Sequence, residues 1–188
     1  MAVLVEGISV VVLREGIDRA YPGGWQRFVD DCPNRTLCAD SYLARVGFMT
    51  PVDVEGFVHR LEACGLIFQK GGETVDIAVV DQLEGPTFPC RWLQFGHVEI
   101  SGHLVAAARH ADCLEMVLIT PDGWRYEESL TTHHTFVPTD QVEERMQLLQ
   151  KDGSMDVYLD FNTGKEGYTG RVFRGGRSDD SEASEGAE

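Results

Sequence analysis

The feature that most constrains the fold is a run of aliphatic residues near the start of the chain. Residues 3–13 read VLVEGISVVVL, and Glu6 is the one charged residue among them. A near-continuous run of this kind is typical of a strand that is buried on both faces. The segment has no basic leader and no small-residue cleavage site, and Glu6 interrupts it, so it indicates neither a signal peptide nor a membrane span. We therefore predict one buried strand over residues 3–13.

The length and composition of the chain fit one soluble globular domain. The chain has 188 residues, of which 43% are hydrophobic and 25% are charged, and these values are ordinary for a folded domain. Residues 175–188 read GGRSDDSEASEGAE, a composition that cannot bury enough apolar surface to become ordered. We predict a single globular domain over residues 1–174 and a disordered acidic tail over residues 175–188.

The charge balance limits the classes of partner. The chain has 31 acidic and 16 basic residues, which gives a formal net charge of −15. Residues 175–188 carry five acids and one arginine, so a charge of −11 remains on residues 1–174. Such acidity disfavours nucleic acid and anionic membranes and attracts basic protein surfaces. The alternative is that the charge only keeps the protein soluble.

The cysteines and the missing cofactor motifs narrow the chemistry further. Five cysteines cannot all pair within one chain, and no two of them form a C-x-x-C motif, so they indicate neither a zinc ribbon nor a thioredoxin-like site. This cysteine usage favours the reducing cytoplasm. The sequence contains no G-x-G-x-x-G, P-loop, H-E-x-x-H, G-x-S-x-G or EF-hand pattern, and we expect no cofactor.

The six histidines do not predict a metal site. His133 and His134 are adjacent in the sequence, and adjacent residues of a strand point to opposite faces. His97 and His103 flank a predicted hairpin turn and fall on opposite faces by the same alternation. We interpret them as polar strand positions and expect no bound metal.

The best-defined helix of the chain is predicted over residues 51–65. Thr50 can accept backbone N–H groups at the helix start, and Pro51 fits the first turn. Apolar residues recur at helical spacing through the segment, and Gly65 is placed to end it in a left-handed conformation. The neighbouring patterns predict two short helices within residues 17–32, broken by PGG at 22–24, and strands near residues 36–48 and 74–83.

The second half of the chain has the pattern of antiparallel hairpins. The predicted elements are a hairpin around Ser101-Gly102, a second around Pro121-Asp122-Gly123, a helix over residues 139–151, and a closing hairpin around TGKEG at 163–167. The apolar residues change parity at Gly96-His97, which predicts a bulge there. We therefore predict an α+β fold with a mixed β-α-β-α-β N-terminal half and a C-terminal half of antiparallel hairpins plus one short helix.

Cys90 is the candidate nucleophile. It lies in the segment GPTFPCRWLQFG, residues 85–96, with Arg91 beside it. A reactive thiolate needs a neighbouring cation and an accessible setting. Adjacent side chains of extended backbone diverge, however, and cysteine is among the most buried residue types. Cys90 is therefore a nucleophile in one interpretation and a buried residue at the start of a strand in the other.

Asp81 and Gln82 follow a predicted buried strand. Polar residues at the carboxyl end of such a strand often project into a ligand crevice, and they equally often cap the following loop. Among the three tryptophans, Trp25 follows a Gly-Gly break and Trp124 follows a turn, so both are candidate exposed anchors for a partner.

Two functions of different class follow from these features. The leading hypothesis is a non-enzymatic, acidic, cytoplasmic module of the bacterial immunity, inhibitor or adaptor kind that binds a basic protein partner. Its candidate partner-binding residues are Asp81, Gln82, Arg91, Trp25 and Trp124. The alternative is a small-molecule enzyme or ligand-binding sensor that uses the loop over residues 81–92. In that case Asp81 and Gln82 orient the ligand, and Cys90 reacts.

Overall fold

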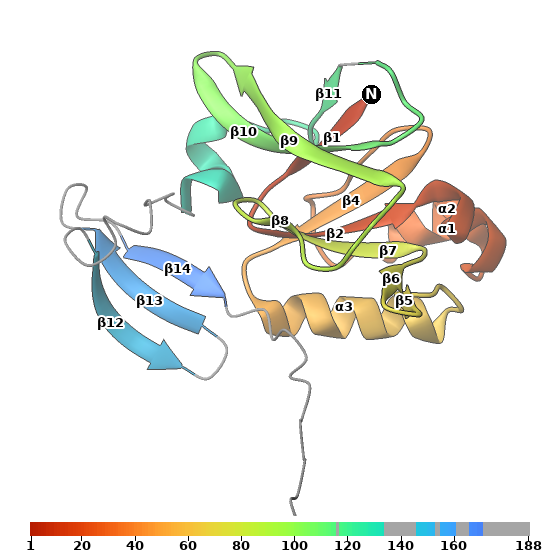
Figure 1. Ribbon diagram of the computed structural model, residues 1–188, viewed down its shortest axis with the longest axis horizontal. Coiled ribbons are helices and arrows are strands. Elements are labelled where there is room, and N and C mark those ends of the chain that lie inside the picture. Colours follow the sequence, from red (N-terminus) through yellow and green to blue (C-terminus); the bar gives the residue numbers. More distant parts are fainter. Residues whose placement is uncertain (116, 134–145, 153–154, 161–165, 171–188) are drawn as a thin grey trace, which may run out of the picture.

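The computed structural model describes residues 1–115, 117–133, 146–152, 155–160 and 166–170 (Figure 1). The protein has an α+β fold. Its described α-helices are α1 (Arg14–Ala20), α2 (Gly24–Asp30) and α3 (Pro51–Ala63). Within the described ranges, none of the helices has the length and apolar character needed to cross a membrane.

The aliphatic run at the start of the chain forms two strands that belong to different sheets. They are β1 (Ala2–Val5) and β2 (Ile8–Leu13). Between them the chain turns at Glu6 and Gly7, and Gly7 has a φ of 55°, a conformation that favours glycine. The prediction of one strand over residues 3–13 is therefore wrong, because the Glu6-Gly7 interruption is a crossing from one sheet to the other.

The central layer is a five-stranded sheet in the order β3-β4-β2-β7-β8. Its other members are β3 (Cys38–Ala39), β4 (Leu43–Phe48), β7 (Ile77–Asp81) and β8 (Gly85–Pro86). All its pairings are antiparallel. The single strand predicted near residues 36–48 is instead two antiparallel strands, β3 and β4. The strand predicted over residues 74–83 is β7, in shorter form.

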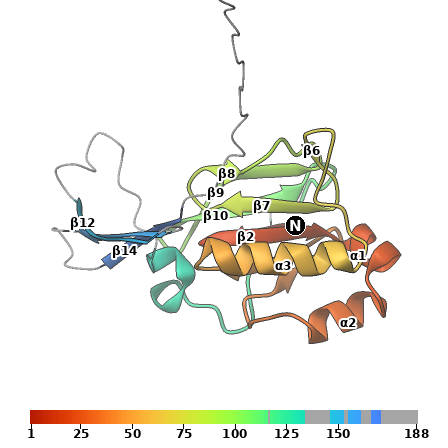
Figure 2. The ribbon, with the colours of Figure 1, turned by 90° about the horizontal axis from the view of Figure 1, so that it is seen from below.

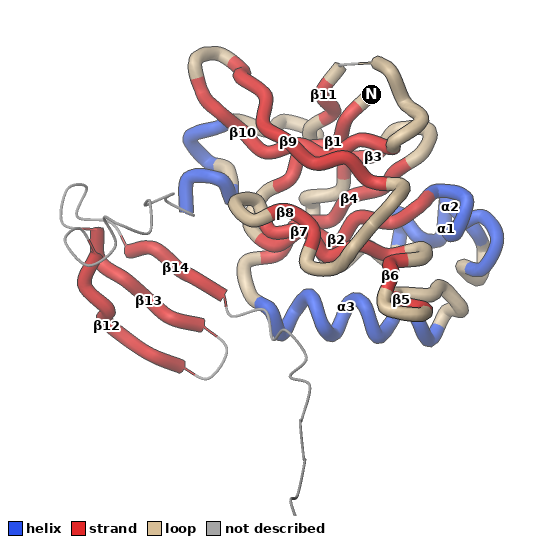
Figure 3. The backbone as a smooth tube through the Cα atoms, in the orientation of Figure 1, coloured by secondary structure: helices blue, strands red, loops and turns tan. Residues whose placement is uncertain are grey.

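The three helices cover one face of the central sheet (Figures 2 and 3). In α3 the predicted start is confirmed, because the Thr50 side chain accepts a hydrogen bond from the Asp53 N–H at 3.3 Å. Gly65 follows the helix with a φ of 98°. The two short helices predicted around PGG are α1 and α2, and Gly23 and Gly24 both have positive φ. The helical side chains that meet the sheet are buried and include Ile17, Phe28, Val54, Phe57, Val58 and Leu61.

A four-stranded sheet in the order β11-β1-β10-β9 covers the other face of the central sheet. Its other members are β9 (Leu93–Ile100), β10 (His103–His110) and β11 (Leu118–Ile119). The predicted turn of the β9–β10 hairpin is confirmed, since Ser101 and Gly102 both have positive φ, as a type I′ turn requires. A second core lies between the two sheets and includes Val3, Val5, Val11, Ala78, Val80 and Ala108.

The rest of the described chain contains three smaller units. The first is the hairpin of β5 (Gln69–Lys70) and β6 (Glu73–Thr74), and the second is the pair of short helices η1 (Tyr126–Glu128) and η2 (Leu130–His133). The third is an antiparallel sheet of β12 (Met146–Asp152), β13 (Met155–Asp160) and β14 (Glu166–Gly170), which lies to the left in Figure 1. β13 and β14 pair antiparallel on the two sides of the predicted closing turn, most of which lies outside the described residues.

Three sequence predictions about the second half are wrong. The β9–β10 register is continuous through Gly96 and His97, so no bulge is present there. No hairpin forms around Pro121-Asp122-Gly123, because β11 pairs in parallel with β1 and the following segment folds into η1 and η2. The helix predicted over residues 139–151 is strand β12 from Met146 onward. The rest of that helix and the tail over residues 175–188 lie outside the described residues.

A buried ion pair joins the two sheets at the crossing. The Arg45 side chain is completely buried and that of Glu6 is 2% exposed, with 3.7 Å between Arg45 Nη1 and Glu6 Oε2. Arg45 also donates to Ser9 Oγ at 2.8 Å and to the Glu6 carbonyl at 2.9 Å. Gly47 leaves room for this guanidinium, since a Cβ there would lie 2.5 Å from Arg45 Nη2. Arg45 in β4 therefore holds the point at which the chain leaves one sheet for the other.

The same carboxylate holds the segment that follows β11. Glu6 Oε1 accepts hydrogen bonds from Trp124 Nε1 and Thr131 Oγ1, both at 2.9 Å. These contacts fix the η1–η2 segment against the four-stranded sheet, where Tyr126 stacks on His103 at a centroid distance of 3.7 Å. Glu6 thus links β4, the sheet crossing and residues 124–131.

We expect Arg45→Met to lower the free energy of unfolding by about 3–5 kcal/mol, because it leaves the Glu6 carboxylate buried without its cation. The matched control is Arg91→Met, which removes the exposed ion pair between Arg91 and Glu73 and should cost less than about 1 kcal/mol. Urea unfolding of both variants measures the difference. Equal losses of unfolding free energy in the two variants would show that the buried ion pair stabilises the fold no more than the exposed one does.

Candidate functional site

The structure places Asp81 and Gln82 in backbone-supporting roles. Asp81 ends β7, and its Oδ1 accepts hydrogen bonds from the N–H groups of Leu83 at 2.7 Å and Glu84 at 3.1 Å. Gln82 is 4% exposed, and its Oε1 accepts from the Gly7 N–H at 2.7 Å. Asp81 therefore caps the β7–β8 loop, and Gln82 binds the backbone of the sheet crossing.

Cys90 is half-buried and packs against the core between the two sheets. Burial raises the pKa of its thiol from 9.0 to about 11, although hydrogen bonds from Leu93, Trp92 and Thr74 act in the opposite direction. The adjacent Arg91 points elsewhere, since its exposed guanidinium pairs with Glu73 at 2.6 Å. The environment of Cys90 therefore favours the neutral thiol.

The two candidate tryptophans lie in different cores. Trp25 belongs to α2, stacks on Phe28 at a centroid distance of 5.6 Å and lies under the guanidinium of Arg14. Trp124 packs against the hydrophobic cluster of the four-stranded sheet and donates to Glu6. Both are half-buried, so neither is the fully exposed anchor that the sequence suggested.

The structure does not bring these candidates together into one site. Asp81 and Gln82 are neighbours, whereas Trp25 lies on the helix side of the central sheet and Trp124 on its other side. Across the described residues, no cluster of three or more histidine, cysteine, aspartate or glutamate side chains is arranged to hold a metal ion. His97 and His103 lie on opposite faces of the hairpin, as expected from their register.

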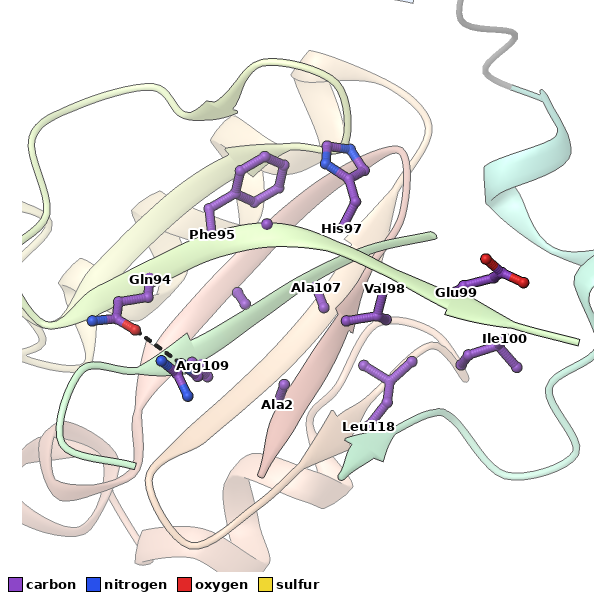
Figure 4. A pocket seen from close by; sticks show the side chains of 12 residues that line it. Ala2, Gln94, Phe95, His97, Val98, Glu99, Ile100, Ala107, Arg109 and Leu118 are labelled. Carbon is purple, nitrogen blue, oxygen red and sulfur yellow. Dashed lines mark hydrogen bonds between the residues drawn. The ribbon is translucent and has the colours of Figure 1, made fainter. Parts of the chain in front are cut away.

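A groove of about 490 Å³ lies on the four-stranded sheet, away from the predicted loop (Figure 4). Its floor is formed by small residues of three neighbouring strands, Ala2, Gly96 and Ala107. Val98, Ile100 and Leu118 are apolar residues of its lining. At one end Arg109 Nε donates to Gln94 Oε1 at 2.9 Å, and Glu99 lies toward the other end.

Gly96 determines how much space the groove offers. A Cβ placed on Gly96 would have no heavy atom within 4 Å, and its φ is not positive. Its partner across the ladder is Ala107, so two of the smallest side chains lie next to each other. The groove is therefore deep here because the side chains of Gly96 and Ala107 are small. The backbone of Gly96 would accept a larger residue without strain.

The outer edge of β9 borders the groove. Among the described residues, β9 is the last strand of its sheet. The Ala111 N–H donates to the Trp92 carbonyl at 2.8 Å in the register that continues the β9–β10 ladder. Bonded and non-bonded pairs alternate along an antiparallel ladder. The even-numbered residues of β9 therefore bond to β10, whereas the backbone N–H and C=O groups of His97 and Glu99 point away from β10, toward the open edge.

The change of parity in β9 marks this site. Leu93 and Phe95 are on one side of β9, whereas Val98 and Ile100 are on the other. Phe95, Val98 and Ile100 all pack against the same hydrophobic cluster and all line the groove. Figure 4 shows Phe95 and His97 on one side of β9 and Val98 on the other. Sequence reasoning interpreted the change as a bulge and so missed Gly96, Val98 and Glu99. The same signal could have indicated a strand whose two halves bury opposite faces.

Comparison with known proteins adds no family to this description. No protein-family model matches the chain, and no significant similarity to a curated protein or to a solved structure is found.

We expect native Cys90 to react with iodoacetamide at pH 8 at least about tenfold more slowly than it does in the urea-unfolded chain. A pKa of about 11 lowers the thiolate fraction about 100-fold relative to a pKa of 9.0, and the greater nucleophilicity of a more basic thiolate offsets part of this. The rate should rise from pH 8 toward pH 11. Peptide mapping by mass spectrometry measures it at each cysteine. Rapid native labelling with an apparent pKa below about 8.5 would restore Cys90 as a candidate nucleophile.

Proposed function

We propose that this protein is a non-enzymatic protein-binding module that adds an extended segment of its partner to the edge of β9. The observation that carries the proposal is the open edge itself, an eight-residue outer strand next to an apolar groove. Strand addition obtains affinity from main-chain hydrogen bonds and specificity from pockets for alternate side chains. Here His97 and Glu99 supply the main-chain groups, and the groove supplies the pocket.

The way in which β9 is built supports this function. Exposed edge strands attract other chains, and proteins usually protect them with lysine, proline, a bulge or a short length. β9 has the sequence LQFGHVEI, which contains no lysine and no proline, and its register has no bulge. An edge kept long and regular is what a strand-binding site requires.

The charge of the chain supports a basic partner. A formal net charge of −15 speeds encounter with a positively charged protein and selects against acidic ones. We place the protein among modules of the bacterial immunity, inhibitor or adaptor kind on this basis. We also propose a cytoplasmic location, with which five unpaired cysteines are compatible.

The ligand-sensor alternative receives no comparable support. Its residues Asp81 and Gln82 bond to backbone N–H groups, and the raised pKa of Cys90 disfavours a thiolate. These contacts are those of a capped loop beside a core. We therefore propose strand addition at β9 and not the ligand-sensor function.

We expect His97→Pro to abolish capture of a stoichiometric protein partner from a lysate of the source organism, while His97→Ala retains it. Proline removes an N–H that points to the open edge and leaves the β9–β10 ladder intact, which is the position that edge strands tolerate. Affinity purification with each variant, followed by mass spectrometry, measures the outcome. Capture should also weaken between about 0.05 and 0.5 M salt. A partner retained equally by His97→Pro, or no partner at either salt concentration, would contradict the proposal.

A further inference from the structure

We propose that the partner segment runs antiparallel to β9 and carries a basic residue opposite Glu99, followed three positions later by a large apolar residue opposite Gly96. This inference rests on the proposed function and names the chemistry of the partner at the same site. Once the antiparallel direction is proposed, the spacing and the two side-chain types follow from the register of β9, the space above Gly96 and the charge of Glu99.

The register sets the spacing of the two side chains. In an antiparallel pair, the partner residues opposite Glu99, Val98, His97 and Gly96 follow one another in that order. Directly opposed residues lie on the same face of a sheet. The residue opposite Gly96 therefore lies on the groove side, and the residue opposite Glu99, three positions earlier, lies on the other face.

The space above Gly96 selects a large apolar side chain. No heavy atom lies within 4 Å of the Cβ position of Gly96, and Ala107 is its neighbour on β10. A side chain that enters there would lie across Gly96 toward Ala107 and beside Val98, which lines the groove. Its apolar surface would leave water on binding, which supplies a driving force that main-chain hydrogen bonds alone do not.

Glu99 selects the basic side chain. It is exposed, and its cross-strand neighbour on β10 is Leu104, which is 66% exposed. Within the part of the chain that the structure describes, Glu99 forms no ion pair. A lysine or arginine on the added strand would stand directly opposite it, where an opposite charge stabilises a cross-strand pair. The overall charge of −15 acts in the same direction.

A second copy of the chain fits this edge poorly. β9 reads LQFGHVEI, so no register of β9 against itself places a lysine or arginine opposite Glu99. Two copies would also bring two charges of −15 together. The partner is therefore a different protein with a basic and apolar extended segment.

The experiment uses a displayed library of random nonapeptides panned on the full-length protein. We expect enrichment of lysine or arginine followed at the third position by leucine, isoleucine, phenylalanine or methionine. A synthetic peptide of the selected consensus is then titrated against the variants by fluorescence anisotropy.

Each variant tests one step of the inference. Gly96→Leu fills the groove from its floor and should lower the affinity for the peptide at least about tenfold, with a smaller effect for Gly96→Ala.

Glu99→Lys should lower the affinity for the peptide about threefold or more, and a peptide with glutamate in place of its basic residue should recover that loss. Leu104→Ala removes an exposed apolar side chain from the other face and should change affinity less than about twofold. If Gly96→Leu lowers the midpoint of thermal unfolding of the protein, its effect on affinity is not used. The pairing of Glu99→Lys with the glutamate-containing peptide then decides whether the side-chain assignment is correct.

The failures of the inference and of the proposed function are distinguishable. Selected peptides that ignore Gly96→Leu and Glu99→Lys but are lost with His97→Pro would overturn the side-chain assignment and leave strand addition in place. Peptides indifferent to all three variants, or no enrichment at all, would overturn both. A concentration-dependent dimer in sedimentation that His97→Pro abolishes would place a second copy on the edge and overturn the basic partner.

Discussion

The carboxylate of Glu6 and the guanidinium of Arg45 lie together in the interior, and the arrangement of both sheets depends on this pair. Two buried charges are costly unless their remaining hydrogen-bonding groups are satisfied. Arg45 meets that requirement with Ser9 Oγ and the carbonyls of Glu6 and Thr36, and Glu6 meets it with Trp124 and Thr131. Burial lowers the pKa of Arg45, and the acidic partner opposes that shift. The pair therefore fixes three separate parts of the chain around one point, the turn between β1 and β2.

The position of the binding edge follows from that turn. β1 leaves the turn to join β10, while β2 joins β4 and β7 in the central sheet. The hairpin of β9 and β10 is thereby placed over the central sheet, which partly buries Phe95 and leaves His97 and Glu99 of the later half of β9 exposed. On the opposite face, the segment held by Glu6 covers the sheet as far as His103, where Tyr126 stacks. The uncovered remainder of that face is the groove, so the same carboxylate that joins the sheets also sets one of its limits.

Local signals in the sequence were enough to predict the elements that depend on local chemistry. The Thr50 cap, the PGG break and the Ser101-Gly102 turn were all read from a few adjacent residues, and the structure contains each of them. The sheet crossing was missed because its cause, Arg45, lies 39 residues from Glu6. The local pattern after Pro121 favours a strand. The contacts with Glu6 that instead hold this segment in η1 and η2 are distant in the chain, so neighbouring residues do not reveal them. Asp81 and Gln82 were noted as polar residues at the carboxyl end of a buried strand, but the sequence could not show that backbone N–H groups are their partners.

Amide hydrogen exchange resolved at each residue of β9 is the most direct test of an edge that binds an extended chain. In the free protein, the amides of Gly96 and Val98 should exchange slowly, because they bond to β10, whereas those of His97 and Glu99 should exchange rapidly. Addition of the selected nonapeptide should slow exchange at His97 and Glu99 and leave Gly96 and Val98 nearly unchanged. Protection of all four amides in the free protein would mean that the edge is already occupied. Protection that instead develops in the loop over residues 81–92 would contradict the account and return the binding site to that loop.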